Sequence, residues 1–176
     1  MTPWWVWWQH GISGAERAKS YLRELGYGVL EIESVLDLSP KPLEYVNRLE
    51  AARTFLALPE AAGLAEADKR IRNILSKSGA DTTALKADDT RLVEVEEKQL
   101  LSLTRTLRAQ VDTLVAQGKF SEALLLTAQL HQPVAQFFDK VMVNVEDPAL
   151  RNNRFALLHE VGNLTNQVVN ISKLAA

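Results

Sequence analysis

Two clusters of basic and amide side chains are the residues in this sequence best suited to bind a polyanion. The first lies in one expected helix and comprises Lys69, Arg70, Arg72, Asn73 and Lys77. Lysine and arginine bind phosphate oxygens, and asparagine can hydrogen-bond the edge of a nucleobase. The run is therefore a candidate RNA contact, and its alternative interpretation is an ordinary polar helix surface.

The second cluster is Arg151 and Asn152, which fall in the first turn of another expected helix. The exposed backbone N–H groups of such a turn favour anions, so a phosphate could bind there. A solvated helix start with local caps is the alternative. Asn153 has the same base-edge chemistry as Asn152, and Arg151 could bind a phosphate or stack as a guanidinium.

Other basic residues are expected to play different parts. Arg48 and Arg53, in an earlier helix, could add charge to the first cluster. Arg154 instead falls within an apolar seam with alternating steps of four and three residues: Leu150, Arg154, Leu157, Val161, Leu164, Val168 and Ile171.

A guanidinium in an apolar seam needs an acceptor, because an unpaired buried charge costs several kcal/mol. The nearby candidates for Arg154 are Asp139, Glu146 and Asp147. We expect a structural role in which Arg154 fastens the preceding turn to the last helix, with direct ligand contact as the alternative. Phe137 and Phe138 are better explained as core packing than as stacking platforms, because apolar residues continue around them.

Little in the sequence supports catalytic or metal-binding chemistry. The chain has no cysteine, and its histidines His10, His131 and His159 are not spaced as metal ligands. No glycine-rich phosphate loop or nucleophile elbow occurs. The acidic run at residues 94–98 is interpreted as a solvated helix face. With a net charge of -2, any RNA contact must come from a local basic patch. We expect a binding module without catalytic, cofactor or metal sites.

Apolar periodicity predicts an all-α fold, a bundle of about seven or eight helices with short connections. Glycine and proline mark the helix ends, and Asp147 followed by Pro148 is typical of a helix start. The expected helices cover residues 16–25, 30–38, 42–56, a segment opened by Pro59, 93–116, 120–130, a continuation beyond a kink at Pro133, and 148–174.

Composition divides the chain into four parts. Residues 1–14 form a leader that carries Trp4 to Trp8, either a fusion scar or start artefact, or a hydrophobic anchor. An N-terminal helical group at residues 15–77 is followed by a polar linker at 78–91 and a C-terminal bundle of long helices at 92–176. No apolar run approaches the ~20 residues that span a bilayer, and we expect a cytoplasmic protein.

The segment "FFDKVMVNVEDPALRNNRFALL" resembles the C-terminal signature of the bacterial glycyl-tRNA synthetase beta subunit. The Asp-Ala-Leu-Arg (DALR) motif that names this anticodon-binding region is Asp147, Ala149, Leu150 and Arg151, with Pro148 in between. A second block, "ADKRIRNILSK" at residues 67–77, is similar to a family segment with asparagine at the position of Asp68. We expect Asp68 either to weaken phosphate attraction or to pair with Arg72 one turn later.

The resemblance covers roughly residues 15–174 and implies an all-helical anticodon-binding domain, related in fold to those of class I synthetases such as the arginyl enzyme. In that family, ATP-dependent glycine activation occurs on a separate alpha subunit, and the beta subunit recognises glycine tRNA within a heterotetramer. The resemblance therefore implies glycine tRNA, an alpha subunit and the remainder of a beta subunit as partners, and a segment that does not aminoacylate by itself.

Two functions remain open at this point. The first is binding of the anticodon arm in support of glycine-tRNA ligase activity. The second is a non-catalytic helical module that contacts another protein.

Overall fold

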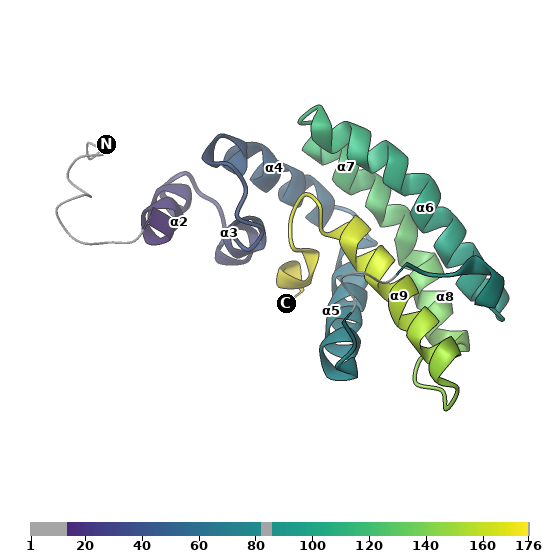
Figure 1. Ribbon diagram of the computed structural model, residues 1–176. Coiled ribbons are helices and arrows are strands. Elements are labelled where there is room, and N and C mark those ends of the chain that lie inside the picture. The colour runs from purple at the N-terminus through teal and green to yellow at the C-terminus, as the bar shows by residue number, and fades with distance from the viewer. Residues whose placement is uncertain (1–13, 82–85, 176) are drawn as a thin grey trace.

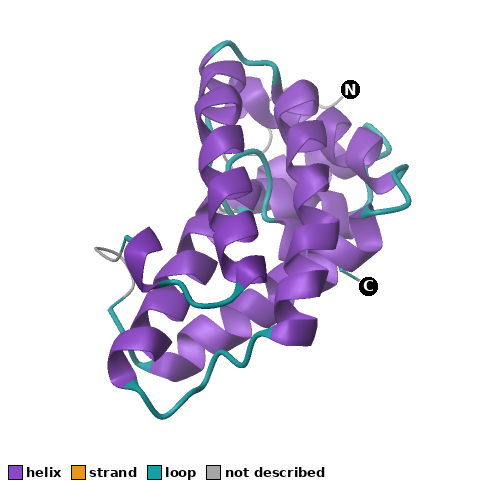
Figure 2. Ribbon diagram, turned by 90° about the vertical axis from the view of Figure 1, so that its right-hand side faces the viewer, coloured by secondary structure: helices purple, strands orange, loops and turns teal. Residues whose placement is uncertain are grey.

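The computed structural model describes residues 14–81 and 86–175, and it is built of helices and loops with no strand in those ranges (Figure 2). The all-α expectation is confirmed. The Trp4 to Trp8 segment lies outside the described residues.

The N-terminal half is a series of helices closed by short turns (Figure 1). Gly26 and Gly79, at φ 90 and 63, follow the first and last of these helices, where a left-handed backbone favours glycine. The elements are α2 (Gly14–Glu24), α3 (Val29–Leu36), η1 (Pro42–Glu44), α4 (Tyr45–Leu56) and α5 (Ala61–Ser78).

The C-terminal half contains the longer helices. The break between the two helices around Pro133 falls at a 3-10 turn just before it, and Pro133 lies in the first turn of the next helix, where its missing N–H breaks no bond. The elements are η2 (Asp89–Arg91), α6 (Val95–Ala116), α7 (Phe120–Thr127), η3 (Ala128–Leu130), α8 (His131–Lys140), α9 (Pro148–Thr165) and η4 (Ile171–Leu174).

The predicted extension of the last helix to Leu174 is wrong. Helix α9 ends at Thr165, and the chain turns back into η4 (Figure 1). Buried Arg48 on α4 donates to the carbonyls of Gln167 and Val168 at 2.8 and 2.7 Å. These two carbonyls accept hydrogen bonds from a distant side chain instead of from the backbone N–H groups of a following helical turn. Val168 and Ile171 are still buried, which explains why the apolar period continued past the end of the helix.

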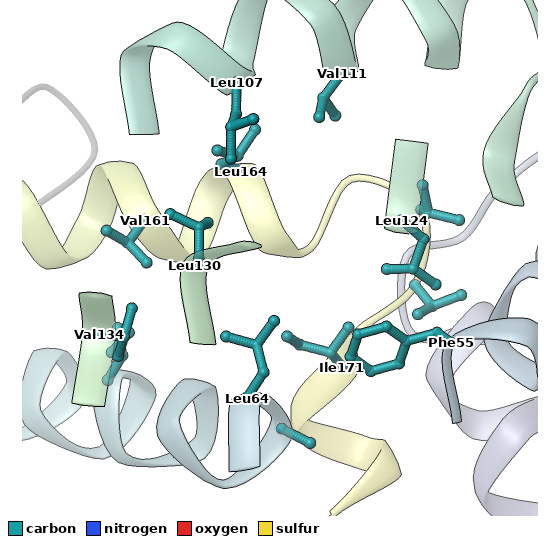
Figure 3. Close-up of a cluster of buried hydrophobic side chains, with 14 of the residues drawn as sticks. Phe55, Leu64, Leu107, Val111, Leu124, Leu130, Val134, Val161, Leu164 and Ile171 are labelled. Atoms are coloured by element: carbon teal, nitrogen blue, oxygen red, sulfur yellow. The ribbon is translucent and has the colours of Figure 1, made fainter. Parts of the chain in front are cut away.

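One core joins the two halves. In Figure 3, Leu64, Leu107, Leu130, Val161 and Leu164 point into a common cluster from α5, α6, η3 and α9. All five are at most 3% exposed. Helix α5 contacts α8, α9 and η4, so the N-terminal basic cluster lies on an element packed directly against the helix that carries the DALR motif.

Residues 86–94 are fastened to α9 and α6. The buried Ala87 donates its N–H to Glu160 Oε1 at 2.9 Å, and Arg105 Nη2 donates to the Ala87 carbonyl at 2.6 Å. Arg105 also pairs with Glu160 at 3.1 Å. This set of contacts holds the end of the predicted 78–91 linker against the C-terminal helices.

Acid should weaken this attachment. Burial disfavours the charge on Glu160, but hydrogen bonds from Arg105 and the Ala87 amide outweigh that effect and hold its pKa below the usual 4.5. A carboxyl with a depressed pKa stabilises the fold above its unfolded pKa, and this stability is lost as pH falls through the folded pKa.

We expect Glu160→Gln to lower the free energy of unfolding at neutral pH, and we expect the difference from wild type to shrink below about pH 4.5. Urea unfolding from about pH 7 to about pH 3 measures it, with exposed Glu122→Gln as control. A difference independent of pH would contradict this account.

Candidate nucleic-acid interface

Helix α5 distributes the first basic cluster over three of its sides. At 3.6 residues per turn, Arg70 and Lys77 lie close to one line along the helix, and Arg72 points to the opposite side. Lys69 and Asn73 are exposed on the crest between them, away from the core. The cluster that is continuous in sequence is therefore divided among three sides of the helix.

The side with Arg70 and Lys77 faces an open groove of about 670 Å³, which we call the first groove. It runs between the C-terminal half of α5 and the connection from α8 to α9. Its lining residues are Arg70, Ile74, Lys77, Ser78, Phe138, Asp139, Lys140, Val141, Met142, Val143, Asn144, Arg151 and Phe155.

The charges of the first groove are unbalanced. Its cations are Arg70, Lys77, Lys140 and Arg151, and its single carboxylate is Asp139. The groove therefore joins members of both basic clusters, although the whole chain has a net charge of -2. The sequence alone does not identify Lys140 as part of this surface, because no local pattern shows that the last residue of α8 faces α5.

Phe138 and Arg70 form one wall of the first groove. The Arg70 guanidinium lies 4.1 Å from the centroid of the Phe138 ring, a cation–π contact. Phe137 is completely buried and meets Phe138 edge to face, with centroids 5.4 Å apart. Phe137 is thus a core residue, whereas Phe138 also presents a surface to the groove.

The start of α9 is already capped by a carboxylate. Asp147 accepts from the N–H groups of Ala149 and Leu150 at 2.9 and 3.4 Å. The side chain of Arg151 donates to the carbonyls of Val145 and Glu146 at 2.9 and 3.4 Å while it lines the groove. A phosphate at this position would meet the Arg151 side chain and not free backbone amides.

The two asparagines after Arg151 are placed differently. Asn152 is exposed but does not line the first groove. Asn153 is buried, and its side chain exchanges two hydrogen bonds with the backbone of Asp88, at 2.7 and 2.9 Å. Asn153 is therefore a structural residue, and its interpretation as a base-edge contact is wrong.

Arg154 is buried and ties the groove to α6. Its Nε lies 2.6 Å from Glu97 Oε1, and its Nη1 donates to the Met142 carbonyl at 2.5 Å. The partner is thus Glu97, and the three carboxylates proposed from proximity in sequence are wrong. Met142 lines the groove, so this bridge positions the connection between α8 and α9.

Glu97 is completely buried, so the interpretation of residues 94–98 as a solvated face is wrong for this residue, whereas Glu94 and Lys98 are exposed. It also accepts from the N–H groups of Val93 and Glu94 at 2.9 and 2.8 Å. Burial alone would raise the pKa of Glu97, but the bonds from Arg154 and these two amides hold it below the usual 4.5. The carboxylate is therefore ionised and paired at neutral pH.

On the other side of α5, Arg72 Nε donates to Asp68 Oδ2 at 3.1 Å, which confirms the expected pairing. Asp68 is 1% exposed and also accepts from Thr165 and Asn166 on and beside the end of α9, at 2.9 and 2.8 Å. Burial raises the pKa of Asp68, opposed first by the charge of Arg72. The pair holds α5 to α9 and fixes the direction of the Arg72 side chain.

Arg48 and Arg53 do not line the first groove, which corrects the expectation that they add charge to the first basic cluster. Arg48 is buried in contact with Glu44 and the carbonyls after α9. The Arg53 guanidinium lies 4.2 Å from the centroid of the Tyr27 ring, and its Nε pairs with Glu31 Oε2 at 3.3 Å. Both guanidiniums fasten the N-terminal helices to one another or to the C-terminal turn.

Within residues 14–81 and 86–175, no group of three or more histidine, cysteine, aspartate or glutamate side chains could hold a metal ion. Over the same ranges, no helix combines the length and apolar character needed to cross a membrane.

Comparison with known proteins shows which protein family this chain resembles. Residues 64–174 match the DALR anticodon binding domain. The chain is 43% identical over 162 residues to the glycine--tRNA ligase beta subunit of Thiobacillus denitrificans, 46% to that of Janthinobacterium sp. and 44% to that of Leptothrix cholodnii. Each alignment covers 92% of this chain and 23% of the relative, so the chain spans about a quarter of the length of the relatives it matches. The first groove and the Glu97–Arg154 pair lie within the matched residues.

Proposed function

The chain belongs to the DALR anticodon-binding domain family, and from this membership we propose that it binds the anticodon arm of glycine tRNA through the first groove. The observation that carries the proposal is the grouping of four cations and one carboxylate around an apolar floor. Arg70, Lys77, Lys140 and Arg151 all lie inside the matched region.

The groove suits an RNA backbone better than a small apolar ligand. Phosphate contacts supply most of the affinity of such complexes, and lysine and arginine on the rim can make them. The floor includes Ile74, Val141 and Phe155. An unstacked base could lie on this floor, because single-stranded RNA loops are bound by stacking on aromatic rings and guanidinium planes. Arg70 and Phe138 offer such a surface.

We also propose the partners that the relatives suggest. The matched relatives are beta subunits of glycine--tRNA ligase and are much longer than this chain. The chain would act in glycine-tRNA aminoacylation together with the remainder of a beta subunit and with an alpha subunit that uses ATP. Its own part would be to position the anticodon arm in the cytoplasm, without a cofactor or catalytic residue.

Binding of glycine tRNA should depend steeply on salt. Each phosphate neutralised by the groove releases condensed counterions, so the logarithm of the affinity should fall with the logarithm of salt concentration by roughly 0.7–0.9 per phosphate contact. With four groove cations, we expect a slope of about 3. Fluorescence anisotropy of labelled glycine tRNA from about 50 to about 200 mM salt measures it.

Two outcomes would contradict this proposal: no binding of the tRNA at low salt, or an affinity that does not change with salt. Either outcome would favour the alternative function, a helical module that contacts protein. An RNA duplex of equal length serves as the control for nonspecific charge attraction, and it should bind more weakly than the tRNA.

A further inference from the structure

Helix α5 has a second groove on the side away from the first, and it differs in chemistry. It has a volume of about 530 Å³ and lies between α5, the end of α9 and the segment after α3. Its polar lining includes Arg72, His159, Asn163 and Asn166, and Leu38 and Leu75 contribute apolar walls.

The second groove is unsuited to a phosphate. Its cation Arg72 is paired with the buried carboxylate of Asp68, so the local charge is close to zero. The first groove, by contrast, has three more cations than carboxylates. A polyanion backbone would therefore prefer the first groove, and the second groove suits a neutral group with polar edges.

Arg72 is held so that part of its guanidinium remains available. Its Nε is bound to Asp68 Oδ2 at 3.1 Å, while among the described residues neither Nη has a hydrogen-bond partner. Asp68 cannot move easily, because it accepts from Thr165 and Asn166 as well. The two Nη groups form a preorganised pair of donors, the arrangement that arginine uses to bind two adjacent acceptors.

The other side of the groove adds a flat ring and an amide. Asn163 Nδ2 lies 2.9 Å from His159 Nε2, which orients both side chains. The imidazole and the side chains of Leu38 and Leu75 provide faces against which a planar ring can pack. The exposed side chain of Asn163 adds amide hydrogen-bonding capacity at the edge.

We propose that the second groove binds one unstacked nucleobase that presents two adjacent acceptors to Arg72, namely cytosine through O2 and N3 or guanine through O6 and N7. This inference rests on the proposed function, because the base would belong to the RNA strand whose phosphates lie in the first groove. Lys69 and Asn73 on the crest of α5 lie between the two grooves, and the helix is only ~10–12 Å wide with its side chains. A short single-stranded segment can therefore contact both grooves.

The test compares base discrimination by the 176-residue wild type, Arg72→Lys and Asn163→Ala. The probes are transcripts of glycine tRNA in which each base of the anticodon loop is replaced in turn by uridine or adenosine, which lack an adjacent acceptor pair. We expect one replacement of a cytidine or guanosine to weaken wild-type binding at least about tenfold. Arg72→Lys keeps the charge but loses the planar pair of donors, so this discrimination should disappear while the salt dependence stays unchanged.

Lys77→Gln is the matched control, because it removes a first-groove charge and should weaken binding of every transcript by the same factor. Circular dichroism checks the fold of each variant. Asn163→Ala alters the second groove without changing a residue that contacts Asp68.

If wild type binds the tRNA but Arg72→Lys and Asn163→Ala keep its full discrimination, the second-groove inference is overturned and the proposed function stands. Wild-type binding that shows no preference among the transcripts would also overturn the second-groove inference and leave the proposed function standing. Absence of tRNA binding by wild type overturns both.

Discussion

Glu97→Ala is expected to lower the free energy of unfolding by about 3–5 kcal/mol, the usual cost of removing one member of a buried ion pair. The reason is that Arg154, only 4% exposed, would lose its carboxylate and keep a buried charge with the Met142 carbonyl as its remaining partner. The amides of Val93 and Glu94 at the start of α6 would also lose their acceptor. Urea unfolding followed by circular dichroism measures the change.

The neighbouring Glu96→Ala is the matched control, because it removes the same side chain from the same helical turn at a position that is not part of the pair. Its effect should stay within about 0.5 kcal/mol. The double variant Glu97→Leu with Arg154→Leu should recover part of the loss, because replacing both side chains leaves no unpaired buried charge, although the amides of Val93 and Glu94 still lack their acceptor. Equal stability of Glu97→Ala and Glu96→Ala would show that the pair does not hold α9 against α6.

The second large effect is on RNA binding. Replacing Arg70, Lys77 and Lys140 together by glutamine should weaken the affinity for glycine tRNA by at least about 100-fold, if each charged contact contributes about 1 kcal/mol or more. The slope of log affinity against log salt should fall by about 2–3, because roughly three phosphate contacts are lost. Anisotropy titrations at several salt concentrations measure both quantities.

A triple variant with the same change in net charge separates this effect from general electrostatics. Lys41, Lys98 and Lys119 are exposed and do not line the first groove. Their replacement by glutamine should leave the salt slope near the wild-type value, with only a small loss of affinity from the weaker overall field. If both triple variants lose affinity equally, the first groove is not the binding surface.

Several features of this protein could be predicted from local sequence because their causes are local. Apolar periodicity indicates a helix from contacts three and four residues apart, and it correctly predicted an all-α chain. The cap by Asp147 and the first-turn position of Pro148 needed only neighbouring residues, and the structure has both. Pairing of Asp68 with Arg72 is another contact within one turn of helix.

Local signals failed where a distant element supplied the partner. The apolar period through Val168 and Ile171 indicates burial, but Arg48, about 120 residues away, takes the carbonyls that a continued helix would use. Asn152 and Asn153 are chemically identical neighbours, and only the approach of the Asp88 backbone makes the second one structural. The acidic run at 94–98 has the composition of a solvated face, yet Glu97 meets Arg154 in the core.

The sequence by itself determined that this chain is helical, which residues begin and end most of its helices, and which family signature it carries. Tertiary structure decided which cations act together. A helix turns successive residues through about 100°, so a basic run in sequence faces several directions, and only the packing of α5 against α8 and α9 selects Arg70 and Lys77 to join Lys140 and Arg151 in one groove. The partner of a buried charge is likewise chosen by the three-dimensional meeting of helices, because desolvation makes a close acceptor necessary without specifying which element provides it.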